Sequence, residues 1–99
     1  MALQYEKKIV LYCPAGYRTS LDSLVEDFIK AGVIFVGVVG KDCAKVEGTV
    51  DALVVGDGSR EYDLLTSSHP NESVEEALEF ARSLSLDFDG PVQLVTLDK

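Results

Sequence analysis

The sequence has few of the residues that build metal sites, disulfide frameworks and membrane spans. It contains two cysteines and one histidine, and the cysteines do not form a C-x-x-C pair. Zinc sites and disulfide-rich folds need several such residues at short spacings, so we expect reduced core thiols, no metal and no cofactor. The longest apolar run, residues 33–39, is far below the roughly 20 residues that cross a bilayer, so we expect no membrane partner.

Basic residues are also scarce. The chain has 9 Lys and Arg against 17 Asp and Glu, a net charge of −8, and the excess of acidic residues lies in the C-terminal half. An acidic surface repels phosphate backbones, so we expect no nucleic-acid partner. The N-terminal segment, MALQYEKK, lacks the apolar stretch of a signal peptide, and we therefore expect a cytoplasmic protein.

What the sequence does contain is an alternation of strand-like and helix-like segments. Its 99 residues, 46% of them hydrophobic, are enough for one core, so we expect a single α/β domain over 1–99. Continuous apolar runs and β-branched residues predict five strands, at 8–13, 33–39, 52–55, 62–66 and 92–97. Apolar residues at helical spacing predict three helices, at 21–29, 42–50 and 73–84.

Local signals support two of the helices. Ala31-Gly32 supplies a left-handed stop after the first, and Ser73 and Glu76 have the spacing of a capping box at the start of the third. The second is weakened by Gly48, although Asp42 can cap it.

This order of elements predicts a small three-layer sandwich. Its sheet would be five-stranded and mostly parallel, Rossmann-like or flavodoxin-like, with helices on both faces. Right-handed crossovers place the first strand centrally, with the second and third on either side of it. The connection to the fourth strand is only about six residues, so we expect that strand to be antiparallel to the third. The expected core comprises Val10, Tyr12, Phe28, Val36, Val38, Leu53, Val55, Leu78 and Ala81.

Open α/β sheets bind ligands at the carboxyl ends of central strands. The loops after the first and third strands would flank such a crevice, and Arg18 with the amides of the first helix could hold a small anion there. The expected ligand contacts are Tyr17, Arg18, Thr19, Lys41, Asp57 and Ser59. An antiparallel fourth strand would put His69 at the opposite end of the sheet, where we expect it to help start the third helix.

The stretch from Cys13 to Thr19 resembles two families of thiol enzymes. It is similar to the phosphate-binding loop of cysteine-dependent phosphatases and arsenate reductases, although four residues, not five, separate Cys13 from Arg18. It also resembles the glutaredoxin and thioredoxin turn, but Gly16 stands where those families have a second cysteine or a serine. These resemblances imply an alternative function, a redox or phosphatase-like enzyme that uses Cys13 and Arg18.

The whole chain resembles a group of short uncharacterised bacterial α/β proteins. It shares with them a strand that ends in a Cys-Pro turn, a Gly-Asp-Gly turn and a Ser-His-Pro helix start. The resemblance implies a fold and no activity. We find no pair of titratable groups at a spacing that assigns acid and base roles. The sequence therefore favours a binding or interaction module for a small anionic ligand or a protein partner, as a monomer or as a weak homodimer through its half-exposed last strand.

Overall fold

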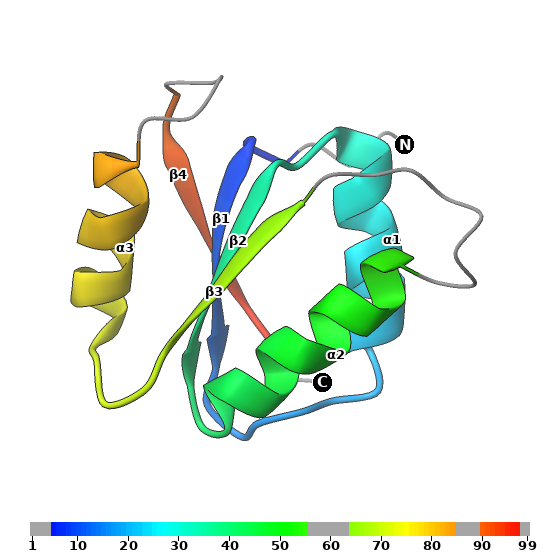
Figure 1. Ribbon diagram of the computed structural model, residues 1–99, viewed down its shortest axis with the longest axis horizontal. Helices are drawn as coiled ribbons and strands as arrows, with labels where there is room; N and C mark the ends of the chain where they lie inside the picture. The colour runs from blue at the N-terminus through cyan, green and yellow to red at the C-terminus, as the bar shows by residue number, and fades with distance from the viewer. Residues whose placement is uncertain (1–4, 56–63, 85–89, 98–99) are drawn as a thin grey trace.

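In the computed structural model, the chain forms one parallel sheet with helices on both faces (Figure 1). The structure describes residues 5–55, 64–84 and 90–97. In these ranges the elements are β1 (Lys8–Cys13), α1 (Leu21–Ala31), β2 (Phe35–Gly40), α2 (Cys43–Val55), β3 (Leu65–His69), α3 (Val74–Ser83) and β4 (Val92–Thr96). The strand order is β3-β2-β1-β4, and all three pairings are parallel. The predicted α/β class is confirmed, but the described sheet has four strands instead of five.

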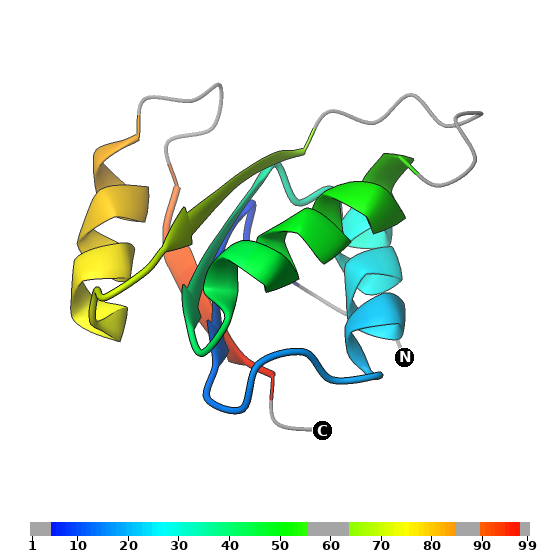
Figure 2. The same ribbon diagram turned by 60° about the horizontal axis from the view of Figure 1, so that its bottom comes forward.

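The direction of each crossover decides which face its helix covers. The chain passes from β1 to β2 and on to β3 in one direction across the sheet, and then returns from β3 to β4 at the opposite edge. Because parallel crossovers are right-handed, α1 and α2 cover one face and α3 covers the other, as Figure 2 shows. The alternation along β1 follows this division, since Ile9 and Leu11 lie in the core under α1 and α2 while Val10 lies in the core under α3.

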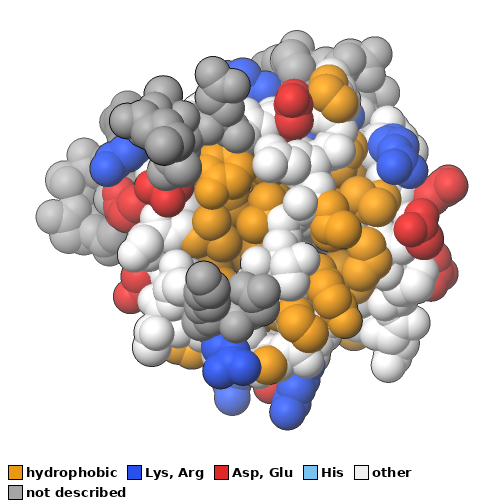
Figure 3. Space-filling model, turned by 180° about the vertical axis from the view of Figure 1, so that it is seen from behind, with side chains coloured by type: hydrophobic (Ala, Val, Ile, Leu, Met, Phe, Trp, Pro, Cys, Tyr) orange, Lys and Arg blue, Asp and Glu red, His pale blue; other side chains and the backbone are white. Residues whose placement is uncertain are grey.

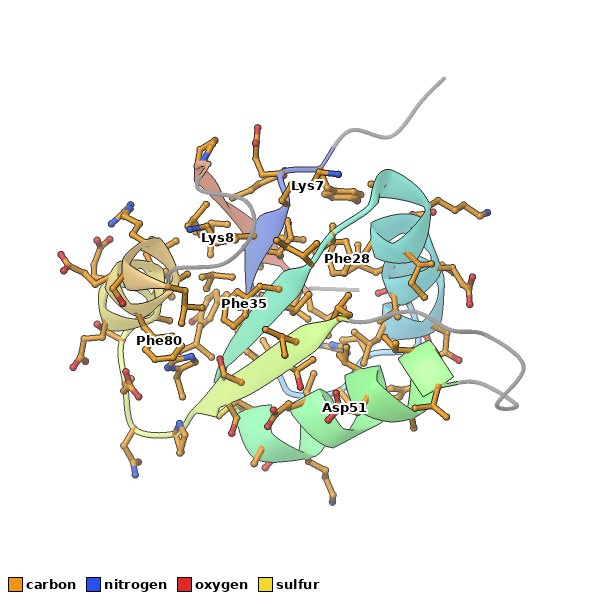
Figure 4. The ribbon with its side chains drawn as sticks, turned by 45° about the horizontal axis from the view of Figure 1, so that its top comes forward. Lys7, Lys8, Phe28, Phe35, Asp51 and Phe80 are labelled. Atoms are coloured by element: carbon orange, nitrogen blue, oxygen red, sulfur yellow. The ribbon has the colours of Figure 1, made fainter. Side chains whose placement is uncertain are left out.

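Most of the predicted core is confirmed. Phe28 packs on the α1 side of the sheet, and Phe35 faces Phe80 of α3 on the other side (Figure 4). Predicted core residues that are buried are Val10, Phe28, Val36, Val38 and Ala81, and those that pack partly buried against the cores are Tyr12, Leu53 and Leu78. Val55 is the exception, because it ends α2 with 58% of its surface exposed.

The predicted third strand at 52–55 is wrong, because these residues are the last turn of α2. The buried residues Cys43, Val46, Val50 and Val54 follow a helical spacing that runs through the whole segment. Gly48 does not stop this helix, since it lies on the outer side with nothing within 4 Å of a Cβ placed on it. A short apolar run fits a buried strand or a helix end equally well, and only the extension of α2 separates the two.

The predicted antiparallel fourth strand is also wrong. The strand that follows α2 is β3, which covers 65–69 instead of 62–66 and runs parallel to β2, with Leu65 paired to Phe35. Because 52–55 belongs to a helix, the connection from β2 to β3 is a full crossover and is long enough for parallel pairing. As predicted, β1 has a neighbour on each side, but the second neighbour is β4 and not a strand at 52–55.

Two local expectations are confirmed. Gly32 ends α1 in the left-handed conformation, and Ser73 and Glu76 form a reciprocal capping box at the start of α3. No helix in the described part of the chain has the length and apolar character needed to cross a membrane.

Candidate functional site

The turn after β1 brings acidic side chains to the place where an anion was expected. Gly16 has a φ of 79°, and a Cβ there would lie 3.2 Å from Asp42 Oδ2, so the Asp42 carboxylate rests against the turn. Tyr17 donates a 3.3 Å hydrogen bond to Oδ1 of Asp22, which is in the first turn of α1. The Asp22 carboxylate complements the dipole of α1 itself, and both carboxylates repel an approaching anion.

The predicted anion ligands lie around this turn. Tyr17, Arg18, Thr19 and Lys41 are all exposed to solvent. Asp57 and Ser59 lie outside the described residues. The turn therefore presents two cations to solvent, with carboxylates of Asp22 and Asp42 close by.

Cys13 is a core residue. Its side chain is fully buried on the face covered by α1 and α2, in the same cluster as Cys43, and both thiols are free. Burial, together with the neighbouring Cys43, raises the pKa of Cys13 to about 11. The thiol is therefore protonated at neutral pH, which disfavours a thiolate mechanism that joins it to the exposed Arg18.

The topological switch point lies between β1 and β4. These strands are neighbours, but the chain leaves β1 through α1 on one face and reaches β4 through α3 on the other, which is the arrangement that opens a crevice. A cavity of about 560 Å³ lies between α1 and the carboxyl end of β4. It is lined by Tyr5, Ser20, Ser23, Leu24, Asp27, Val95, Thr96 and Leu97. The prediction placed this crevice between the first strand and a strand at 52–55, because it assigned the second neighbour of β1 to those residues.

A second cavity, of about 660 Å³, lies at the other end of β4. It is lined by Tyr5, Glu6, Lys7, Ala31, Pro91, Val92 and Gln93. Tyr5 lines both cavities, which follow one another along the α1 side of β4, and we call the two together the β4 groove. α2 packs on β2 and β3, and α1 packs mainly on α2, so space remains between α1 and β4.

The edge strand β4 is apolar and uncharged. Among the described strands it pairs with β1 alone, and its sequence, VQLVT, contains no charged residue. Leu94 is 45% exposed, and Val92 and Val95 are partly buried. Figure 3, which views the molecule from the β4 side, shows hydrophobic side chains gathered across the middle of this face, with charged groups around its margin.

The parallel direction of β3 places His69 at the carboxyl edge of the sheet, not at the opposite end as predicted. His69 nevertheless does not join Cys13, because its side chain faces α3 and the Cys13 side chain faces α1 and α2. Its partners are Ser67, with Oγ 2.8 Å from Nε2, and Glu72, with Oε2 3.3 Å from Nδ1. Ser67 and His69 are two residues apart on β3, so their side chains lie on the same face of the sheet. The predicted strand at 62–66 ended before both residues, and this shared face therefore could not be predicted.

Comparison with known proteins is consistent with the uncharacterised group that the sequence resembles. No curated protein and no solved structure matches the chain. A family model described as a domain of unknown function (DUF7684) matches residues 3–97. The chain therefore belongs to the DUF7684 family.

Proposed function

We propose that this chain is an interaction module whose edge strand β4 pairs with β4 of a second copy. The observation that carries the proposal is the uncharged edge of β4 with Leu94 at its centre, 45% exposed. Edge strands commonly carry lysines, prolines or bulges that block further pairing, and 92–96 contains neither lysine nor proline. An exposed strand of this kind is suited to pairing with another chain.

A second copy suits this edge because β4 is complementary to itself. Antiparallel pairing about a two-fold axis at Leu94 sets Val92 opposite Thr96 of the partner subunit, so no like charges meet. The same axis brings the end of the groove lined by Glu6 and Lys7 beside the Asp27 end of the partner's groove, where Lys7 is the cation that can face a carboxylate. This complementary placement occurs twice in a symmetric dimer and fixes the register.

The other sheet edge is less suitable. Thr66 Oγ1 on β3 lies 2.9 Å from Glu47 Oε2 and 2.8 Å from Asp51 Oδ1, and both carboxylates belong to α2. Pairing of β3 with itself would bring two such carboxylate pairs together. The repulsion between them favours association through β4.

The test is the mass of the protein in solution over a concentration series, by sedimentation or light scattering. We expect a reversible dimer, and we expect Leu94→Lys to give a monomer because it sets two lysines together at the axis. Leu65→Lys is the matched control, since Leu65 is an exposed leucine on the other edge strand, and it should leave the dimer intact. A concentration-independent monomer, or dissociation by Leu65→Lys alone, contradicts the proposal.

The register has its own test in the charged ends of the groove. Lys7→Glu should weaken the dimer, and Lys7→Glu combined with Asp27→Lys should restore it, because the reversed charges again face opposite charges. Failure of the double variant to restore association would exclude this register while leaving pairing through β4 in place.

The two free cysteines fit a reducing compartment, which supports a cytoplasmic location for the module.

A further inference from the structure

Ser67, His69 and Glu72 form one chain of hydrogen bonds on the α3 face of the sheet. The distances are 2.8 Å from Ser67 Oγ to His69 Nε2 and 3.3 Å from His69 Nδ1 to Glu72 Oε2. A carboxylate only accepts hydrogen bonds, so a neutral imidazole keeps its proton on Nδ1 and accepts the serine proton at Nε2. Hydroxyl, imidazole and carboxylate in this order prepare a serine for nucleophilic attack.

The backbone and the packing hold this arrangement. β3 ends at His69, and the turn that follows, with Asn71 at a φ of 63°, returns Glu72 to the ring. The Glu72 N–H also donates a 3.3 Å hydrogen bond to the carbonyl oxygen of His69. The imidazole meets the Phe80 ring edge-on at a centroid distance of 4.9 Å, and His69 is only 4% exposed. Its ring plane is therefore restrained by contacts from both β3 and α3.

The serine itself can be approached. α3 packs over β1, β2 and β4, and Ser67 on the edge strand β3 is only partly buried. Its neighbour across the ladder is Gly37, where a Cβ would lie 3.3 Å from Ser67 Oγ and 3.1 Å from the Phe35 ring, so the hydroxyl lies beside this ring and is not covered by a side chain of residue 37. Leu65 is 56% exposed and Phe80 is 41% exposed, and they provide apolar surface on the same face.

We propose that Ser67 is a nucleophile that accepts the acyl group of a small, neutral, apolar ester. The apolar surface of Leu65 and Phe80 suits an uncharged acyl chain. The carboxylate of Glu72 and the net charge of −8 disfavour an anionic substrate.

The reaction is an ester hydrolysis in two steps. Ser67 Oγ bonds to the carbonyl carbon and gives its proton to His69 Nε2. The bond from that carbon to the alcohol oxygen then breaks, and the alcohol leaves with the proton from Nε2. In the second step water bonds to the acyl carbon and passes a proton to Nε2, and the ester bond to Ser67 breaks. The carboxylic acid is released, and the proton returns from Nε2 to Oγ.

The experiment combines a fluorophosphonate probe, located by peptide mass spectrometry, with hydrolysis of p-nitrophenyl butyrate. We expect one adduct per chain, on Ser67, and hydrolysis that is lost in Ser67→Ala. Ser68→Ala is the matched control, because Ser68 is the next residue of β3 and faces the other side of the sheet. This variant should be labelled by the probe, and should hydrolyse the ester, at the same rates as the unchanged chain. Adducts spread over several serines, or equal labelling of Ser67 and Ser68, would overturn the proposal.

Variants of the other two residues separate chemistry from packing. His69→Gln should slow labelling by about 100-fold or more, the range of general-base catalysis, and thermal unfolding will show whether it remains folded. Glu72 is a positioning residue on the surface, so Glu72→Gln should keep the fold and slow labelling. Glu72→Asp, which keeps a carboxylate at this position, should retain more of the labelling rate than Glu72→Gln. A labelling rate that Glu72→Gln leaves unchanged, or normal labelling of folded His69→Gln, would refute the relay.

Discussion

The backbone N–H of Lys41 donates a 2.8 Å hydrogen bond to the carbonyl oxygen of Cys13 and thereby joins the ends of β2 and β1. This contact is close because the last residue of β2, next to Lys41, is Gly40, which has a φ of 115°. A Cβ at Gly40 would lie 2.5 Å from the same carbonyl oxygen. The junction between the ends of β1 and β2, next to the turn after β1, therefore requires glycine at position 40.

We predict that Gly40→Ala lowers the free energy of unfolding by about 3 kcal/mol, from the strained φ and the displaced carbonyl. Gly48→Ala is the control, because Gly48 lies in the middle of α2 with free space around it, and it should stabilise the protein by up to about 1 kcal/mol. Urea unfolding of both variants measures the difference. Equal stabilities would show that the β1–β2 junction relaxes at no cost.

The raised pKa of Cys13 predicts a pH dependence of stability. With a pKa of about 11 in the folded state against an ordinary value of 9.0, the thiol holds its proton more strongly when the chain is folded. Its stabilising contribution is complete below pH 9.0 and is lost as the pH rises towards about 11. Unfolding of the unchanged chain and of Cys13→Ala across this range should show a smaller loss in the variant. Rapid alkylation of folded Cys13 near pH 6 would contradict the assignment of this thiol to the core.

Lys8 is a fully buried lysine on the α3 face of β1. Its Nζ donates a 3.2 Å hydrogen bond to the carbonyl oxygen of Ala81, in the last turn of α3, where the helix dipole favours a cation. We predict that Lys8→Ala lowers the free energy of unfolding by about 3 kcal/mol because it leaves a cavity. Lys8→Met fills the same space without a charge and should stay within about 1 kcal/mol of the unchanged chain. Equal losses in the two variants would show that the ammonium group, and not the volume, is what the core requires.

The small-anion site at the first turn stays a prediction with a direct measurement. Phosphate titrated into isotopically labelled protein should move the amide resonances of 16–20 first. Because the Asp42 carboxylate lies against Gly16, Asp42→Asn should tighten binding several-fold. Shifts centred on 67–71, or none at millimolar phosphate, would exclude this site.

Local signals in the sequence were sufficient for most of the elements. The apolar stripe of α1, its Gly32 stop and the capping box of α3 depend on residues a few positions apart, so they can be read without any tertiary contact. The apolar runs of β1 and β2 likewise identify buried strands of a parallel sheet. The Ser67–His69–Glu72 spacing is local too, and a correct boundary for β3 would have revealed it.

The placement of the candidate sites was decided by the tertiary structure alone. The run at 52–55 has no intrinsic preference strong enough to choose between strand and helix, and its packing on the sheet through Val54 makes it part of α2. That choice reverses β3, moves His69 to the carboxyl edge and gives β4 the place beside β1. Strand order depends on pairing between residues far apart in the chain, which no local pattern encodes. The sequence therefore determined which segments are regular, and only the fold determined that β4 is an edge strand of the described sheet and that His69 and Cys13 lie on opposite faces.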